Sequence, residues 1–173
     1  MSDKPELSRP YALDRLLPDG ATFAITASAR EREALARRFD LVALDGLEAK
    51  GTVRPLPERG LIEVEGRLRA SLAQSCVVTF EPVPEAIDTD FLRVFVRDGE
   101  VPEEIEIDPE AEQPEPLEGS ELDVGEIVAE ELAMALDPHP RSPGADAALA
   151  EANAAQAEAR TGAFASLAAL RRH

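Results

Sequence analysis

The chain has 173 residues and a formal net charge of −17, because 35 Asp and Glu residues outnumber 18 Lys and Arg residues. The acidic excess lies in residues 81–137, which hold 20 acidic and two basic residues, and this sign argues against strong nucleic-acid binding there. One cysteine excludes an intramolecular disulfide, and no stretch has the pattern of a secretion signal or membrane span, so we expect a cytoplasmic protein.

The first part of the chain alternates between strand and helix patterns. Residues 11–17 should form a strand or an extended arm, and residues 22–27 alternate polar and apolar side chains as a strand does. Ser28 and Glu31 have the spacing of a capping box, which predicts a helix over residues 31–39.

The middle of the chain predicts a hairpin of longer strands. A short strand at residues 41–44 should end at the turn dipeptide Asp45-Gly46. Residues 61–79 alternate in polarity as a half-buried antiparallel strand does, or two strands joined at a bend, and they should pair with residues 48–56. Cys76 falls on the apolar parity of this strand, which favours a small buried hydrophobe. A redox dithiol needs a second sulfur, and a zinc site needs about four ligands.

A further strand is predicted over residues 87–97, apolar on both faces toward its end. Residues 98–119 are rich in Pro and Glu and should form an acidic loop, in which residues 104–107 could pair briefly at a sheet edge.

A helix is predicted over Val124–Leu136, with Asp123 as its N-cap. Its apolar stripe includes the position of Glu131, so this carboxylate should either extend to the surface or meet an arginine of the sheet, such as Arg67 or Arg69.

The expected fold class is α+β: a curved antiparallel sheet or partial barrel with one inserted helix, a C-terminal amphipathic helix packed on it, and an Ala-rich helical tail. We expect an N-terminal arm at residues 1–20 and a single domain at 21–142, which includes the acidic loop. Residues 143–173 form the tail, whose helix should break at Gly162.

The chemistry-bearing residues do not form a catalytic motif. The sequence has no Gly-rich phosphate loop, nucleophile elbow or His-rich run, so we expect a protein that is not an enzyme and needs no cofactor or metal. Asp88 and Asp90 would share one face of a strand, which leaves a metal-dependent hydrolase as an alternative to solvated acids. His139 is interpreted as a loop residue rather than a general base.

The acids of the predicted helix gather on one side. Glu126 and Glu130 lie one turn apart and repel each other by a few tenths of a kcal/mol, which suggests an external basic partner. A solvated face is equally compatible with the pattern.

Three segments resemble the YceD family of large ribosomal RNA subunit accumulation proteins: 74–83, 122–141 and 164–170. Many members carry Cys-x-x-Cys where this chain has Cys76 and Thr79, and Asn-Pro-Phe where it has 162–164, so a metal or redox role is not carried over. The residues that carry the family signature are Gln74, Cys76, Thr79, Glu81, Pro82, Asp123, Gly125, Glu126 and Pro138.

The resemblance implies a role in the accumulation of large-subunit ribosomal RNA in a bacterial cytoplasm. With the acidic middle, it predicts a non-catalytic ribosome assembly factor that binds a basic ribosomal protein or a large-subunit precursor particle. The expected partner-binding residues are Asp123, Glu126, Glu130, Asp137 and Arg141. An alternative is direct RNA contact through the N-terminal half, by Arg30, Arg32, Arg37 and Arg38.

Overall fold

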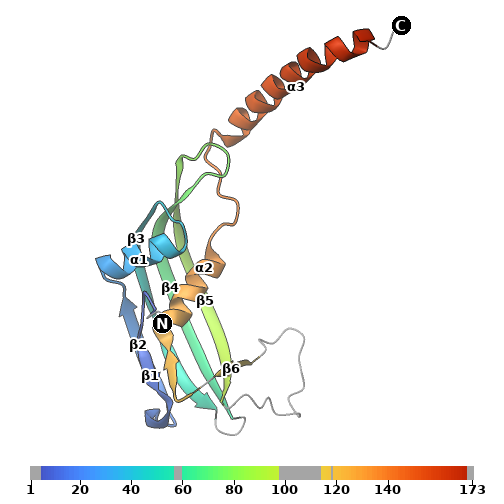
Figure 1. Ribbon diagram of the computed structural model, residues 1–173. Helices are drawn as coiled ribbons and strands as arrows, with labels where there is room; N and C mark the ends of the chain where they lie inside the picture. The colour runs from blue at the N-terminus through green and yellow to red at the C-terminus, as the bar shows by residue number, and fades with distance from the viewer. Residues whose placement is uncertain (1–4, 57–59, 98–113, 118, 171–173) are drawn as a thin grey trace. The chain divides into compact units, whose positions relative to one another are not determined.

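The structure is a computed structural model that describes residues 5–56, 60–97, 114–117 and 119–170, and the side chains of all of these but 158–170 (Figure 1). The chain divides into two compact units. The larger unit consists of residues 1–73 and 84–136, and the smaller unit consists of residues 74–83 and 137–173. The domain boundaries expected from the sequence remain a prediction.

A curved five-stranded sheet is the main structural element of the larger unit. Its strands, in spatial order, are β2 (Ala21–Thr26), β3 (Ala43–Leu56), β4 (Leu61–Ser75), β5 (Pro82–Arg97) and β6 (Glu115–Leu117). β2 pairs antiparallel with β3, and β3 pairs antiparallel with β4. β6 adds to β5 in parallel, over Phe95–Arg97. The sheet is antiparallel-dominated and open, which confirms the predicted α+β fold.

Two helices and a small ribbon complete this unit. α1 (Ala29–Arg38) and α2 (Val124–Ala135) lie on the same face of the sheet (Figure 1). β1 (Pro10–Ala12) pairs antiparallel with β7 (Glu121–Asp123), and a single 3-10 turn, η1 (Leu13–Arg15), follows β1. In the smaller unit, α3 (Ala145–Leu170) is the long tail helix. No helix among the described residues combines the length and the apolar content that a membrane crossing requires.

The two helix starts have the caps that the sequence predicts. The Ser28 hydroxyl accepts from the backbone N–H of Glu31, while the Glu31 carboxylate accepts from the N–H of Ser28, so the capping box is complete. Asp123 accepts from the N–H groups of Gly125 and Glu126 at the start of α2. Each cap satisfies N–H groups that have no partner inside the helix.

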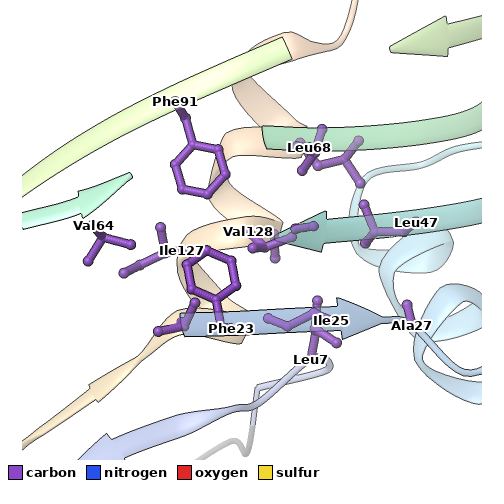
Figure 2. Close-up of a cluster of buried hydrophobic side chains, with 14 of the residues drawn as sticks. Leu7, Phe23, Ile25, Ala27, Leu47, Val64, Leu68, Phe91, Ile127 and Val128 are labelled. Carbon is purple, nitrogen blue, oxygen red and sulfur yellow. The ribbon is translucent and has the colours of Figure 1, made fainter. Parts of the chain in front are cut away.

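The hydrophobic core lies between the sheet and the helices. Ile127 and Val128 of α2 point toward the sheet, where the rings of Phe23 and Phe91 lie close to them (Figure 2). The sheet also contributes Leu47, Val64 and Leu68 to this core. Burial of this apolar surface is the main force that holds α2 on the sheet.

A pair of glycines makes room for the two phenylalanine rings. Gly51 of β3 and Gly66 of β4 are partners in register. A Cβ atom on Gly66 would lie 2.7 Å from the Phe91 ring, and one on Gly51 would lie 2.7 Å from the Phe23 ring. A larger residue at Gly66 would therefore push the Phe91 ring away, whereas one at Gly51 would also meet the backbone carbonyl oxygen of Glu65, at 2.0 Å.

Several predicted boundaries are wrong. Asp45-Gly46 is not a turn, because β3 continues through it with a register shift between Leu44 and Gly46, which is a β-bulge. The strand expected over residues 61–79 ends at Ser75, so Cys76 lies in a turn rather than on a strand. α3 runs from Ala145 to Leu170 and therefore passes Gly162 without a break.

The acidic loop is only partly described. β6 lies within residues 98–119, where a loop was predicted, because its pairing with β5 is long-range and leaves little local signal. The possible edge strand at residues 104–107 lies outside the described residues.

Candidate functional site

Asp123 joins the N-terminal arm to the start of α2. Its carboxylate accepts from the Ser8 hydroxyl at 2.7 Å and from the Arg9 backbone N–H at 2.6 Å, in addition to the helix N–H groups. A Cβ atom on the next-but-one residue, Gly125, would lie 2.6 Å from the carbonyl oxygen of Leu7. These contacts give Asp123 and Gly125 a structural role. Asp123 binds the arm by hydrogen bonds, and the missing side chain of Gly125 lets the arm backbone lie close to the helix.

Glu126 forms an ion pair with the end of α1. Its carboxylate contacts the Arg38 guanidinium at 2.6 Å, and Glu6 contacts the same guanidinium at 3.1 Å. The hydrogen bond that Arg38 donates to Glu126 raises the pKa of Arg38 despite partial burial. The guanidinium also lies 5.2 Å from the centre of the Phe39 ring. Glu126 therefore holds α1 and α2 together.

Arg93 of β5 gathers three carboxylates. Its guanidinium contacts Glu115 at 2.5 Å, Glu131 at 3.0 Å and Glu130 at 3.2 Å. The side chains of Arg93 and Glu131 are both 11% exposed, whereas that of Glu130 is 45% exposed. The hydrogen bond that Arg93 donates to Glu115 raises the pKa of Arg93 more than burial lowers it.

The arginine that meets Glu131 is not the one expected. Arg67 and Arg69 flank Leu68, whose side chain is in the core, so their own side chains point to the opposite face of β4. There they contact the acids of β5 instead. Arg93 could have been proposed from the sequence, since it is one of only two basic residues in the acidic stretch.

Asp88 and Asp90 are ion-paired on the face of the sheet opposite the helices. Asp88 contacts Arg67 at 2.6 Å and Arg69 at 3.2 Å, while Asp90 contacts Arg67 at 3.7 Å. The hydrogen bond from Arg67 lowers the pKa of Asp88. Within the described residues, no group of three or more His, Cys, Asp or Glu side chains could hold a metal ion. The pair therefore gives the hydrolase alternative no support.

The four arginines of α1 divide into two groups. Arg32 donates to the backbone carbonyls of Ala27 and Leu44, at 2.7 and 3.2 Å, and Arg38 is paired with acids as described above. Arg30 and Arg37 are exposed. Two of the four cations proposed to contact RNA are thus engaged inside the protein.

The smaller unit contains a turn built around Cys76. The sulfur accepts from the backbone N–H groups of Val78 and Thr79, both at 3.4 Å, and of Ser142 at 3.3 Å. Burial raises the pKa of the thiol, but the hydrogen bonds from the N–H groups and the Thr79 side chain together lower it by more. The resulting pKa is about 6. Ser142 is 66 residues away in sequence and was not predicted, because nothing local marks such a contact.

The other signature residues of the smaller unit support the same turn. Glu81 accepts from the Cys76 N–H through its backbone carbonyl, at 2.9 Å, and Pro82 begins β5 directly after it. The Gln74 side chain donates to the carbonyl of Asp137 at 3.0 Å, just before Pro138. The signature of this unit is therefore an arrangement of backbone contacts.

Two predicted partner-binding residues belong to this unit and are exposed. The Asp137 carboxylate accepts from the His139 backbone N–H at 2.8 Å, and Arg141 contacts Asp146 at 2.6 Å. The other three, Asp123, Glu126 and Glu130, lie in the larger unit. The side chain of Glu130 is more exposed than that of Glu126, at 45% against 26%.

The sequence comparisons point to one family. Residues 64–171 match the family model described as large ribosomal RNA subunit accumulation protein YceD. The search of curated proteins and the search of solved structures both gave no match. The matched range includes residues of both units.

Proposed function

Because the chain belongs to the YceD family, we propose that it supports the accumulation of large-subunit ribosomal RNA as a non-catalytic assembly factor in the cytoplasm. The observation that carries this proposal is the family match, which covers residues 64–171. The signature positions in that range build a helix start, an interhelical ion pair and a turn held by backbone contacts. These are the parts of a rigid binding scaffold.

The proposed partner is a basic ribosomal protein. The net charge of −17 repels RNA phosphates and attracts cationic proteins, and such attraction accelerates association at low salt. Of the acids on α2, Glu130 is the best placed for an outside partner. Its side chain is 45% exposed, and its contact with Arg93, at 3.2 Å, is longer than the contact that Glu126 makes with Arg38.

Capture from a cell lysate tests this proposal. The tagged full-length chain should recover a basic ribosomal protein or a large-subunit precursor particle at low salt and lose it at high salt, because exposed charges are screened. Cells that lack the protein should hold less large-subunit RNA relative to small-subunit RNA. Recovery of neither partner at any salt concentration, with normal RNA levels in the deletion strain, would refute the proposal.

Direct RNA contact through α1 is the second candidate, and exposure of Arg30 and Arg37 is the observation in its favour. Replacing both by Glu should leave particle association unchanged if the partner is a protein bound elsewhere. Loss of association in this double variant would favour RNA contact instead.

A further inference from the structure

A groove of about 620 Å³ lies in the larger unit, where two helices meet strand β5 of the sheet. Its walls are the end of α1, at Arg38 and Phe39, the second half of α2, and the segment Asp90–Arg93 of β5. Glu115, the first residue of β6, lines the same groove. The groove therefore continues along β5 from the point where β6 begins.

Within the described residues, the β5 segment in this groove forms an open edge of the sheet. β5 lies between β4 and β6, and β6 pairs only with Phe95–Arg97. Among the strands that the structure describes, none pairs with Asp90–Arg93 on the β6 side. An open strand edge offers backbone N–H and C=O groups to an incoming strand, and proteins use this geometry to bind extended peptides.

The lining combines apolar surface with excess negative charge. Met134 is 67% exposed at the groove, beside the partly buried ring of Phe39. Three carboxylates, of Glu115, Glu130 and Glu131, and two guanidinium groups, of Arg38 and Arg93, line the walls. Both guanidinium groups are already neutralised, since Arg93 contacts three carboxylates and Arg38 contacts two.

We propose that this groove binds an extended, Lys- or Arg-rich protein segment that adds to β5 as a further strand. Side chains alternate in direction along a strand, so every second side chain of the segment faces α2. Cationic side chains at these positions can reach Glu130 and Glu115, and their aliphatic stems can cover Met134. This inference rests on the proposed function and specifies its partner: the segment belongs to the basic ribosomal protein. Phosphate groups and acidic segments are excluded by the charge of the walls.

A peptide of alternating lysine and valine is the first probe, with a glutamate–valine peptide of equal length as its control. Amide hydrogen exchange of the full-length protein, followed residue by residue by NMR, should slow at Asp90–Arg93 when the lysine peptide binds at low salt. The glutamate peptide should cause no such change. Binding without protection of this edge, or no binding of the lysine peptide, would overturn the inference.

Capture of the natural partner gives an independent test with a matched pair of variants. Met134→Lys places a cation in the groove, whereas Leu17→Lys makes the same change at a side chain of nearly equal exposure, 68%, outside it. Met134→Lys should weaken recovery of the ribosomal protein on the order of tenfold, and Leu17→Lys should not. Equal recovery by both variants would overturn the proposal that the groove binds the partner but leave the proposed function standing. Failure of the unaltered protein to recover any ribosomal protein would refute the proposed function itself.

Discussion

Arg93 on β5 reaches Glu131 on α2 at 3.0 Å, and both side chains are only 11% exposed. An ion pair at this depth carries a large desolvation cost, and its partners depend on each other. The pair therefore fixes the position of α2 on the sheet at the wall of the groove.

Replacing Arg93 by Met should lower the free energy of unfolding by roughly 3–5 kcal/mol, because Glu131 would remain buried without its cation. Urea denaturation followed by circular dichroism measures this loss. The double variant Arg93→Met/Glu131→Leu should regain most of the stability.

Arg54→Met is the control for that measurement, because Arg54 is 49% exposed in its pair with Glu63. Its cost should be much smaller, because solvent screens an exposed ion pair. Equal losses of stability for Arg54→Met and Arg93→Met would show that the buried pair contributes no more to the free energy of unfolding than the exposed pair.

Gly66→Ala should destabilise the protein by about 1–3 kcal/mol, because the new Cβ atom would meet the Phe91 ring. Gly46→Ala is the matched control in the same sheet, since its nearest neighbour would lie at an ordinary 3.9 Å. Thermal or chemical unfolding distinguishes the two. If Gly66→Ala/Phe91→Leu is no more stable than Gly66→Ala, the ring is not the obstacle.

The Cys76 thiol should ionise with a midpoint of about pH 6 in the native protein, because three backbone N–H groups point at the sulfur. Thiolate absorbance in the ultraviolet reports on this group alone, since the chain has one cysteine. In denaturant the midpoint should return to about 9.0, the ordinary value.

The same shift gives a direction for stability. The native state favours the ionised thiol, so its contribution grows as the pH rises from about 6 to about 9 and is lost at lower pH. Cys76→Ser should lack this rise. A native midpoint at or above 9.0 would mean that burial outweighs the N–H groups.

Glu31 should make the protein sensitive to acid. Its hydrogen bond with Arg9 lowers the pKa to about 2, against a smaller opposing effect of burial. A carboxylate with a depressed pKa stabilises the fold above its ordinary value, 4.5, and loses that contribution as the pH falls toward 2.

Glu31→Gln is the test of this sensitivity, because Gln keeps the capping hydrogen bonds and removes the charge. The stability difference between the unaltered protein and Glu31→Gln should shrink steadily between pH 4.5 and pH 2. A constant difference would show that the Arg9 contact does not depend on ionisation.

Local patterns predicted much of the fold. The strand at β2, the hairpin of β3 and β4, and both capped helices follow from side-chain periodicity and cap residues that act within a few positions. The bulge after Leu44 was missed because Asp45-Gly46 has the same composition as a turn, and only the partner strand distinguishes them.

The candidate site was harder to predict, because its contacts join distant parts of the chain. The acids of α2 were identified from their spacing, but the cations that neutralise them lie 37 or more positions away, at Arg93 and Arg38. The turn around Cys76 likewise depends on Ser142. No periodicity records such pairs, so the sequence predicted the charges and not their partners.

The link between Asp123 and Ser8, 115 positions apart, sets an order of events during synthesis. β1 pairs with β7, and the N–H of Val124 bonds to the carbonyl of Arg9, so the arm has no place to dock until α2 has been made. The native contacts of the arm therefore cannot be completed before residues 121–124 have been synthesised.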